Sequence, residues 1–358
     1  MRLRLRAEPV GAGDLVYGTG LLRSLGAEAA RRLPPGPCVL VTDRTVARLH
    51  GGVALASLRA AGFRPRVVSL APGERSKTLD GAARVLEALG ALRAGREAAV
   101  FALGGGVVTD LAGFAAAIHA RGVPWVAVPT TLLAMADAAV GGKTGVDLPG
   151  AKNAAGAFHL PRLVLADAAT LRTLPPRHLR NGLAEVAKCE LLAGLRPGLP
   201  RVRRLAAAAG DAARLGRLAA RAAAAKARVV ESDPLERNGR RIVLNLGHTV
   251  GHALEAATGF DGSLLHGEAV AIGIVVAVRL AEGRGLAAAG RAAETAAALD
   301  RLGLPAALPP GRAARDLAAL TRTDKKRGRD GLRMVLPRER GAPVLVRVEA
   351  PELAAAIG

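Results

Sequence analysis

Residues 98–110 read AAVFALGGGVVTD and decide the fold of the first half of the chain. The apolar run Ala98–Leu103 is typical of a buried strand, and the glycines Gly104–Gly106 end it. A helical pattern follows the glycines, so the stretch predicts a strand, a tight turn and a helix. Glycines at such a turn let the backbone approach a pyrophosphate, and the helix N-terminus offers free N–H groups. A tight turn without any ligand is the alternative interpretation.

Short apolar runs alternate with helical patterns on both sides of this stretch. We expect strands at Cys38–Thr42, Arg66–Leu70, Trp125–Val128 and Leu163–Ala166, and helices at Val53–Ala61 and Leu79–Leu92. This alternation predicts a Rossmann-like α/β domain with a parallel sheet, whose ligands bind beyond the carboxyl ends of the strands. Residues 1–6 alternate like an edge strand. Asp43 follows a predicted strand, where a carboxylate accepts a ribose hydroxyl or simply caps a helix.

The second half of the chain has a different pattern. Residues 177–320 are dominated by Ala, Leu and Arg with helical periodicity. This pattern predicts an all-α C-terminal domain, with a short hairpin at 333–336 and 344–348. The expected division is therefore an α/β domain over residues 1–174 and a helical domain over 175–358.

The composition narrows the classes of protein further. The 51 basic and 30 acidic residues of the 358 give a net charge of +21, and seven of the basic residues are lysines. Scattered arginines and only 2% aromatics argue against nucleic-acid binding, which favours clustered basic stripes and aromatic stacking. The longest apolar stretch, 269–278, is too short to span a membrane, and two cysteines form no disulfide framework. We expect a cytoplasmic protein.

Two clusters combine glycine or helix patterns with charged residues. Residues 137–153 read DAAVGGKTGVDLPGAKN, a glycine-rich loop in which Lys143, Lys152 and Asn153 suit an anionic ligand. In a chain that prefers arginine, each lysine marks a candidate position for a compact point charge. Glu185 and Lys188 share a helix face, and a surface ion pair is the alternative interpretation.

A histidine cluster follows. Residues 241–255 read RIVLNLGHTVGHALE, and His266 lies one loop later. His248 and His252 share one helical face, so spacing favours these two as the paired ligands of a divalent metal such as Zn²⁺. Thr249 stands where a zinc protease would have its catalytic glutamate. Buried structural histidines are the alternative.

Together these clusters resemble the 3-dehydroquinate synthases, a family of sugar phosphate cyclases. The resemblance rests on Gly104–Asp110, Arg121 with Val128–Thr131, Asp137–Asn153, Leu174–Lys188, Asn245–Glu255 and Leu265–Glu268. It implies an NAD-binding α/β domain, a helical metal- and substrate-binding domain, and a homodimer.

The resemblance also implies roles for individual residues. It assigns the metal (Zn or Co) to Glu185, His248 and His266, and moves His252 to the substrate and to proton transfer. The implied catalytic residues are His252, Lys188, Asn245, Lys143 and Arg241. The implied substrate-binding residues are Asp137, Lys143, Lys152, Asn153, Lys188, Lys226, Arg241, Asn245, His252, Lys325, Lys326 and, from a neighbouring subunit, Arg121. The implied NAD contacts are Asp43, Glu74, Lys77, Gly105, Gly106, Val107, Val108, Thr109, Asp110, Thr130, Thr131, Lys143, Lys152, Thr170, Leu171, Arg172 and Thr173.

Two positions depart from the family pattern. Thr109 stands where the family commonly has glycine. The segment 233–241 is one residue longer than usual, which leaves the role of Glu236 open.

The resemblance implies conversion of 3-deoxy-D-arabino-heptulosonate 7-phosphate to 3-dehydroquinate and phosphate, with NAD regenerated in each cycle, so that the net reaction is that of a lyase in the shikimate pathway. Three alternatives stay open. They are a related cyclase such as a 2-epi-5-epi-valiolone or 2-deoxy-scyllo-inosose synthase, a metal-dependent polyol or glycerol dehydrogenase, and a nucleic-acid-binding protein.

Overall fold

The computed structural model describes residues 1–149, 151–208, 210–259, 261–308 and 332–357. The chain forms two compact units, here called unit 1 (Met1–Pro175 with Gly210–Arg237) and unit 2 (Pro176–Ala209 with Asn238–Gly358). The sequence pattern predicts a single division at 174/175. The packing differs from that expectation because residues 210–237 belong with the first unit. Lys325 and Lys326 lie outside the described residues.

Unit 1 is built on a seven-stranded sheet. Its strands, in spatial order, are β1 (Arg2–Ala7), β2 (Gly11–Gly18), β9 (Leu163–Asp167), β6 (Trp125–Pro129), β5 (Ala99–Gly104), β3 (Pro37–Asp43) and β4 (Arg64–Leu70). All neighbours pair in parallel except β1, which runs antiparallel to β2 at the edge. The central strands are fully buried, as their unbroken apolar runs predict. The Rossmann-like parallel sheet is confirmed.

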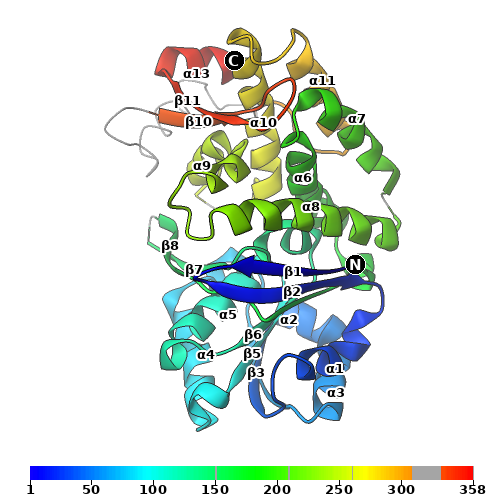
Figure 1. The fold of residues 1–358 in the computed structure, drawn as a ribbon, viewed down its shortest axis with the longest axis vertical. Coiled ribbons are helices and arrows are strands. Elements are labelled where there is room, and N and C mark those ends of the chain that lie inside the picture. The colour runs from blue at the N-terminus through cyan, green and yellow to red at the C-terminus, as the bar shows by residue number, and fades with distance from the viewer. Residues whose placement is uncertain (150, 209, 260, 309–331, 358) are drawn as a thin grey trace. The chain divides into compact units, whose positions relative to one another are not determined.

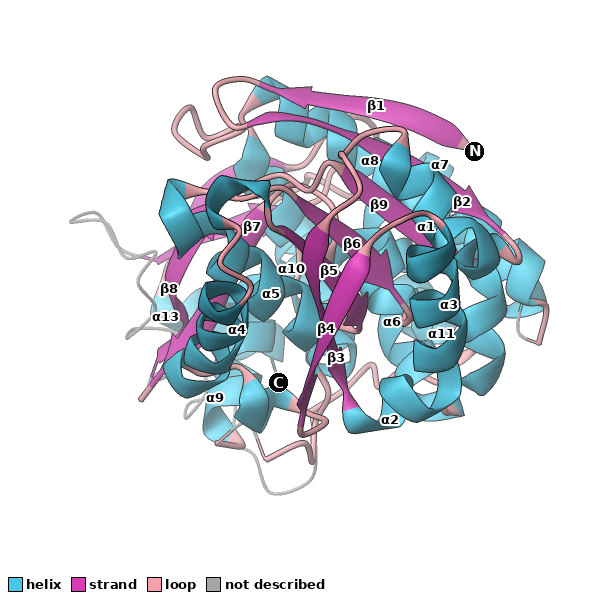
Figure 2. Cartoon of the chain, turned by 90° about the horizontal axis from the view of Figure 1, so that it is seen from below, coloured by secondary structure: helices cyan, strands magenta, loops and turns pink. Residues whose placement is uncertain are grey.

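Helices cover both faces of this sheet (Figure 2). Helices α1 (Leu25–Ala30) and α3 (Gly52–Ala60) cover one face, whereas α4 (Leu79–Ala91) and α5 (Gly106–Ile118) cover the other. The short α2 (Arg44–Val46) follows β3, and the long α8 (Ala212–Ser232) packs against β1 and β2. Leu25 and Leu58 from the first face meet Phe101 of the sheet in a buried apolar cluster.

The glycine-rich stretch 137–153 is not a loop throughout, as its composition indicated, because its second part lies in strands. These strands, β7 (Lys143–Leu148) and β8 (Ala151–Phe158), form an antiparallel hairpin. Glycine allows the two strands to lie close together, because a Cβ on Gly156 would lie 2.5 Å from the Thr144 carbonyl oxygen. The correction matters for the site, since Lys143, Lys152 and Asn153 therefore stand on paired strands.

Unit 2 is mainly helical (Figure 1). Its helices are α6 (Pro176–Leu191), α7 (Leu195–Leu205), α9 (His248–Ala257), α10 (His266–Gly283), α11 (Arg291–Asp300) and α13 (Ala350–Ile357), and its expected hairpin is β10 (Leu332–Leu336) with β11 (Val344–Val348). Helix α10 is buried along most of its length and packs against α6, α9, α11 and α13. A helix that is apolar on nearly every side is typical of a central core helix.

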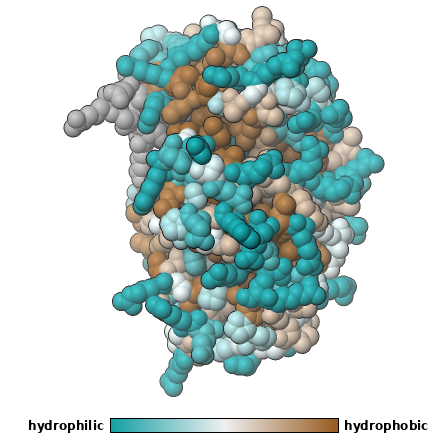
Figure 3. Space-filling view, viewed as in Figure 1, coloured by the Kyte–Doolittle hydropathy of each residue, from teal (hydrophilic) through white to brown (hydrophobic). Residues whose placement is uncertain are grey.

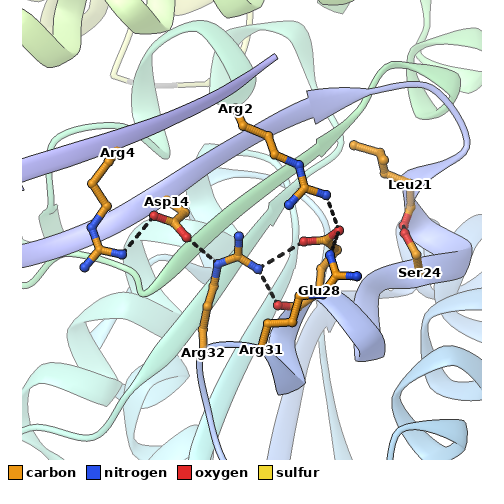
Figure 4. A network of polar contacts seen from close by, with 8 residues as sticks. All are labelled: Arg2, Arg4, Asp14, Leu21, Ser24, Glu28, Arg31 and Arg32. Carbon is orange, nitrogen blue, oxygen red and sulfur yellow. Dashed lines mark hydrogen bonds and ion pairs between the residues drawn. The ribbon is translucent and has the colours of Figure 1, made fainter.

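Arginines tie the edge hairpin of unit 1 to α1 (Figure 4). Arg4 and Arg32 both bind the Asp14 carboxylate on β2, at 3.1 and 2.7 Å. Arg32 also reaches Glu28, which accepts a further hydrogen bond from Arg2. Part of the arginine excess therefore has a structural role.

No helix among the described residues is long and apolar enough to cross a membrane. Hydrophilic side chains are spread over the visible face of the molecule (Figure 3), as a chain-wide arginine bias predicts.

Candidate functional site

The segments expected to contact NAD follow the carboxyl ends of five neighbouring parallel strands. Asp43 ends β3, the 72–77 loop follows β4, Gly105 follows β5, Thr130 and Thr131 follow β6, and residues 168–173 follow β9. Strands β9, β6, β5, β3 and β4 are consecutive in the sheet and parallel, so these segments meet along one edge. The sheet topology thus gathers residues that are up to 130 positions apart in the chain.

The glycine turn between β5 and α5 is shaped by packing. A Cβ on Gly104 would lie 2.6 Å from the Val108 side chain, and one on Gly105 would lie 3.1 Å from Thr131. Gly106 begins α5, where the first N–H groups have no carbonyl acceptor within the helix. Thr109 is buried and donates its hydroxyl to the Gly106 carbonyl at 3.0 Å, so the departure from glycine is accommodated inside the helix.

A buried lysine lies beside this turn. Lys77, which is only 4% exposed, donates to the Asp110 carboxylate at 2.6 Å and to the Asn153 side-chain oxygen at 2.5 Å. Burial alone would lower the pKa of Lys77, but the Asp110 and Glu74 carboxylates raise it above its ordinary value, so the ammonium stays charged. Burial likewise raises the pKa of Asp110, and Lys77 opposes that rise.

Other predicted residues of unit 1 form cation–carboxylate pairs. Lys226 on α8 binds both the main-chain oxygen and the carboxylate of Asp137, at 2.8 and 3.0 Å. Lys143 pairs with Glu236 at 2.5 Å. Glu236, whose role the longer segment 233–241 left open, therefore contacts one of the lysines predicted to bind a ligand. The remaining pair, Lys152 with Glu74, is looser at 3.3 Å.

Two carboxylates at strand ends act as helix caps. Asp43 Oδ1 accepts from the Thr45 and Val46 amides, which matches the simpler of the two interpretations of this residue. Asp167, which the sequence analysis did not single out, accepts from three main-chain amides and fixes the start of the 168–173 turn. In that turn, Thr173 contacts His50 at 3.0 Å.

Unit 2 brings three predicted metal ligands together. Nitrogen atoms of His248 and His266 and a carboxylate oxygen of Glu185 lie within 4.8 Å of one another. The Nε2 atoms of both histidines face Glu185 Oε1, at 3.7 and 3.6 Å. These separations are too long for hydrogen bonds and close to the roughly 3.3 Å between neighbouring ligands of a tetrahedral zinc ion. The donor set therefore fits a divalent metal.

Glycine contacts hold the helices of this cluster close together. A Cβ on Gly273 of α10 would lie 1.9 Å from the carbonyl oxygen of Gly247, the residue that precedes α9. Gly247 itself has a φ of +80°, which disfavours other residues. Gly267 approaches the Asn181 carbonyl of α6 just as closely, and its amide donates to the Asn181 side chain at 2.5 Å. These contacts bring α6, α9 and α10 close enough for their ligand side chains to converge.

Charges around the cluster are strongly coupled. Lys188 and Glu185 form an ion pair through Glu185 Oε2, and both side chains are buried, so the surface ion pair weighed from the sequence is excluded. Burial would lower the pKa of His266, but the carboxylates of Glu185 and Glu255 outweigh it and raise that pKa to about 9. Metal uptake by His266 must therefore displace a proton at neutral pH.

The chain is similar to known proteins over nearly all of its length. Residues 67–181 match the N-terminal domain of 3-dehydroquinate synthase, and residues 182–327 match its C-terminal domain. A 3-dehydroquinate synthase of Symbiobacterium thermophilum is 46% identical over 346 residues, covering 94% of each chain. One from Xanthomonas campestris pv. campestris is 47% identical, covering 91% of this chain and 90% of that protein. The chain belongs to the 3-dehydroquinate synthase family.

Solved structures of other enzymes share the fold of this chain. A 2-epi-5-epi-valiolone synthase from Streptomyces hygroscopicus, with NAD⁺ and Zn²⁺ bound, has a TM-score of 0.84 at 32% identity, covering 96% of this chain and 95% of that one. A 2-deoxy-scyllo-inosose synthase in complex with carbaglucose-6-phosphate, NAD⁺ and Co²⁺ has a TM-score of 0.86 at 25% identity, covering 100% and 99%. An NADH-dependent butanol dehydrogenase from Thermotoga maritima shares the fold, with a TM-score of 0.68 at 17% identity.

The other residues expected from the family pattern are placed as follows. Arg241 is buried at the start of the turn η9 (Arg241–Asn245), and Asn245 ends that turn half-buried. The half-buried His252 has its ring centroid 5.3 Å from that of His248 and 6.3 Å from that of His266, so it borders the cluster. Arg121 is exposed.

Glu255 was quoted from the sequence without a role. It is buried, and its Oε2 lies 3.1 Å from His266 Nδ1. Its position seven residues after His248 places both on one helix face, a signal that could have indicated it.

Proposed function

We propose that this chain is a 3-dehydroquinate synthase. It converts 3-deoxy-D-arabino-heptulosonate 7-phosphate to 3-dehydroquinate and phosphate, with a catalytic NAD and a divalent metal, as a carbon–oxygen lyase. The observation that supports this most strongly is the convergence of Glu185, His248 and His266 in a chain nearly half identical to named synthases. Cofactor and metal are carried over from relatives that bind NAD⁺ with Zn²⁺ or Co²⁺.

In this proposal, a metal held by these three ligands would supply Lewis-acid polarisation, and the segments at the carboxyl edge of the sheet would hold NAD, which would supply reversible hydride transfer. The chain's own residues bind the substrate and manage its protons. Lys188 is held beside Glu185 in a buried ion pair, so it offers a fixed positive charge to an anionic or developing oxyanion group. His252 borders the metal cluster, where an imidazole can accept a proton at one nitrogen and donate one from the other.

Residues of unit 1 bind anionic groups in the same proposal. Lys143 and Lys152 each have a carboxylate partner and an exposed fraction of side chain, so an incoming phosphate competes with Glu236 and Glu74 for their ammonium groups. The amides that open α5 suit a pyrophosphate. A Cβ on Gly106 would make only ordinary contact, 3.4 Å from Ala138, so packing within the chain does not require this glycine, and close approach of a ligand accounts for it in this proposal.

The proposal includes a cytoplasmic homodimer in which Arg121 reaches the substrate phosphate of the neighbouring subunit. The exposure of Arg121 supports a role toward another molecule. Sedimentation analysis of wild type and Arg121→Ala, together with a measurement of substrate binding by both proteins, tests this part. We expect a dimer in both, with weaker substrate binding only in the variant.

A phosphate-release assay on the heptulosonate phosphate tests the main proposal. We expect release that needs NAD and is abolished by chelation, and little release from glucose 6-phosphate. His266→Ala should lose metal and activity while keeping its fold. Preference for glucose 6-phosphate would indicate a different sugar phosphate cyclase, and no release by folded, metal-loaded protein would refute the proposal.

A further inference from the structure

The two histidines of the metal cluster are held in the same orientation by different acceptors. His248 Nδ1 lies 3.2 Å from the Leu246 main-chain oxygen, and His266 Nδ1 lies 3.1 Å from Glu255 Oε2. A carbonyl or a carboxylate oxygen only accepts, so Nδ1 of each ring carries the hydrogen. The Nε2 atoms of both rings then face the same oxygen of Glu185.

This arrangement decides which nitrogen is free for a metal. A neutral imidazole has one N–H and one lone pair, so a donor bond from Nδ1 leaves the lone pair on Nε2. A carboxylate forms a stronger hydrogen bond than a carbonyl does, and it makes the opposite nitrogen a better donor to the metal. Glu255 is 4% exposed, so water does not weaken this bond appreciably.

We infer that Glu255 is the positioning residue of the metal centre. It fixes the tautomer and ring orientation of His266 and strengthens the bond from His266 Nε2 to the metal, without binding the metal itself. This inference rests on the proposed metal site.

A second arrangement of the same side chains defines the rival assignment. His252, Glu255 and His266 also offer ligand atoms within 4.8 Å of one another, with Glu255 as a ligand. The contact of 3.1 Å between Glu255 and Nδ1 falls in the hydrogen-bond range, whereas the contacts of 3.6 and 3.7 Å to Glu185 do not. Distances therefore favour a hydrogen bond at Nδ1 and a metal at Nε2.

Zinc affinity, measured by chelator competition on the full chain, separates these roles. We expect Glu255→Ala to weaken zinc binding about 10- to 100-fold. The loss in Glu255→Gln should be smaller, because the amide oxygen still accepts from Nδ1. Glu190→Gln is the matched control, since Glu190 is a buried glutamate on α6 whose carboxylate faces Arg201. It should bind zinc as wild type does.

Nitrogen-15 NMR of the zinc-loaded proteins supplies a readout that a merely structural role would not change. We expect His266 protonated on Nδ1 in wild type and Glu255→Gln, and a weakened preference in Glu255→Ala. Wild-type affinity in Glu255→Ala would overturn the inference. So would complete loss of zinc, equal to that of Glu185→Ala, because Glu255 would then be a ligand. Absence of zinc binding in wild type would instead refute the proposed metal site.

Discussion

Replacing Gly273 with alanine should pull the metal ligands apart. The added Cβ would lie 1.9 Å from the Gly247 carbonyl oxygen, whereas ordinary contact begins at 3.4 Å. Because both partners of this contact include backbone, α9 and α10 must separate by about 1.5 Å. His248 and His266 begin these two helices, and metal–ligand bonds tolerate only about 0.2 Å. Zinc affinity should therefore fall on the order of 100-fold or more, and stability by about 1–3 kcal/mol.

A graded series separates this geometric effect from a general effect of alanine. Gly251→Ala meets Val270 at 3.3 Å and should bind zinc almost as wild type does. Gly283→Ala, at the exposed end of α10, meets nothing within 4 Å and should raise the melting temperature slightly. Chelator competition and thermal melts of the metal-free proteins give both quantities. Wild-type affinity and stability in Gly273→Ala would refute the reasoning.

Three further predictions concern charge. Burial would raise the pKa of Glu28, but the arginines that bind its carboxylate lower that pKa below its ordinary value. The ionised carboxylate therefore stabilises the fold above pH about 4.5, and this stabilisation is lost as the pH falls through the lowered pKa. The urea midpoint of Glu28→Gln should accordingly approach that of wild type in acid. Because His266 has a pKa of about 9 without metal, zinc affinity should rise about tenfold per pH unit between pH 7 and 9, and a flat profile would contradict this. Lys77→Met leaves the Asp110 carboxylate without its ammonium partner and should lower the free energy of unfolding in urea by about 3 kcal/mol. The double variant Lys77→Met/Asp110→Asn should recover part of this loss. Additive losses from the two substitutions would exclude coupling between the two side chains.

The central strands of the parallel sheet could be predicted from the sequence because each of them is buried on both faces. Continuous apolar runs such as Ala98–Leu103 report that burial directly. The hairpin 143–158 was not accessible, since its glycines resemble those of a loop and only the close approach of Gly156 to Thr144 explains them. The packing of α8 with unit 1 could not be predicted either, because helical periodicity does not indicate which unit a helix belongs to.

The candidate metal site shows the same limit. Spacing within one helix favoured His248 with His252, because positions four apart share a face. The structure groups His248 with Glu185 and His266, which lie on other helices, and leaves His252 at the border of that group. Such convergence depends on packing contacts at Gly247 and Gly267. Resemblance to the family gave the three ligands, whereas the orienting role of Glu255 needed atomic distances.

The balance between product and reduced cofactor tests the central claim most directly. Wild-type protein loaded with zinc would receive excess heptulosonate phosphate and NAD at a tenth of the enzyme concentration or less. We predict many equivalents of 3-dehydroquinate and phosphate per NAD, formed in equal amounts, with no accumulation of NADH. Accumulation of NADH in proportion to substrate consumed, or phosphate without 3-dehydroquinate, would contradict the account.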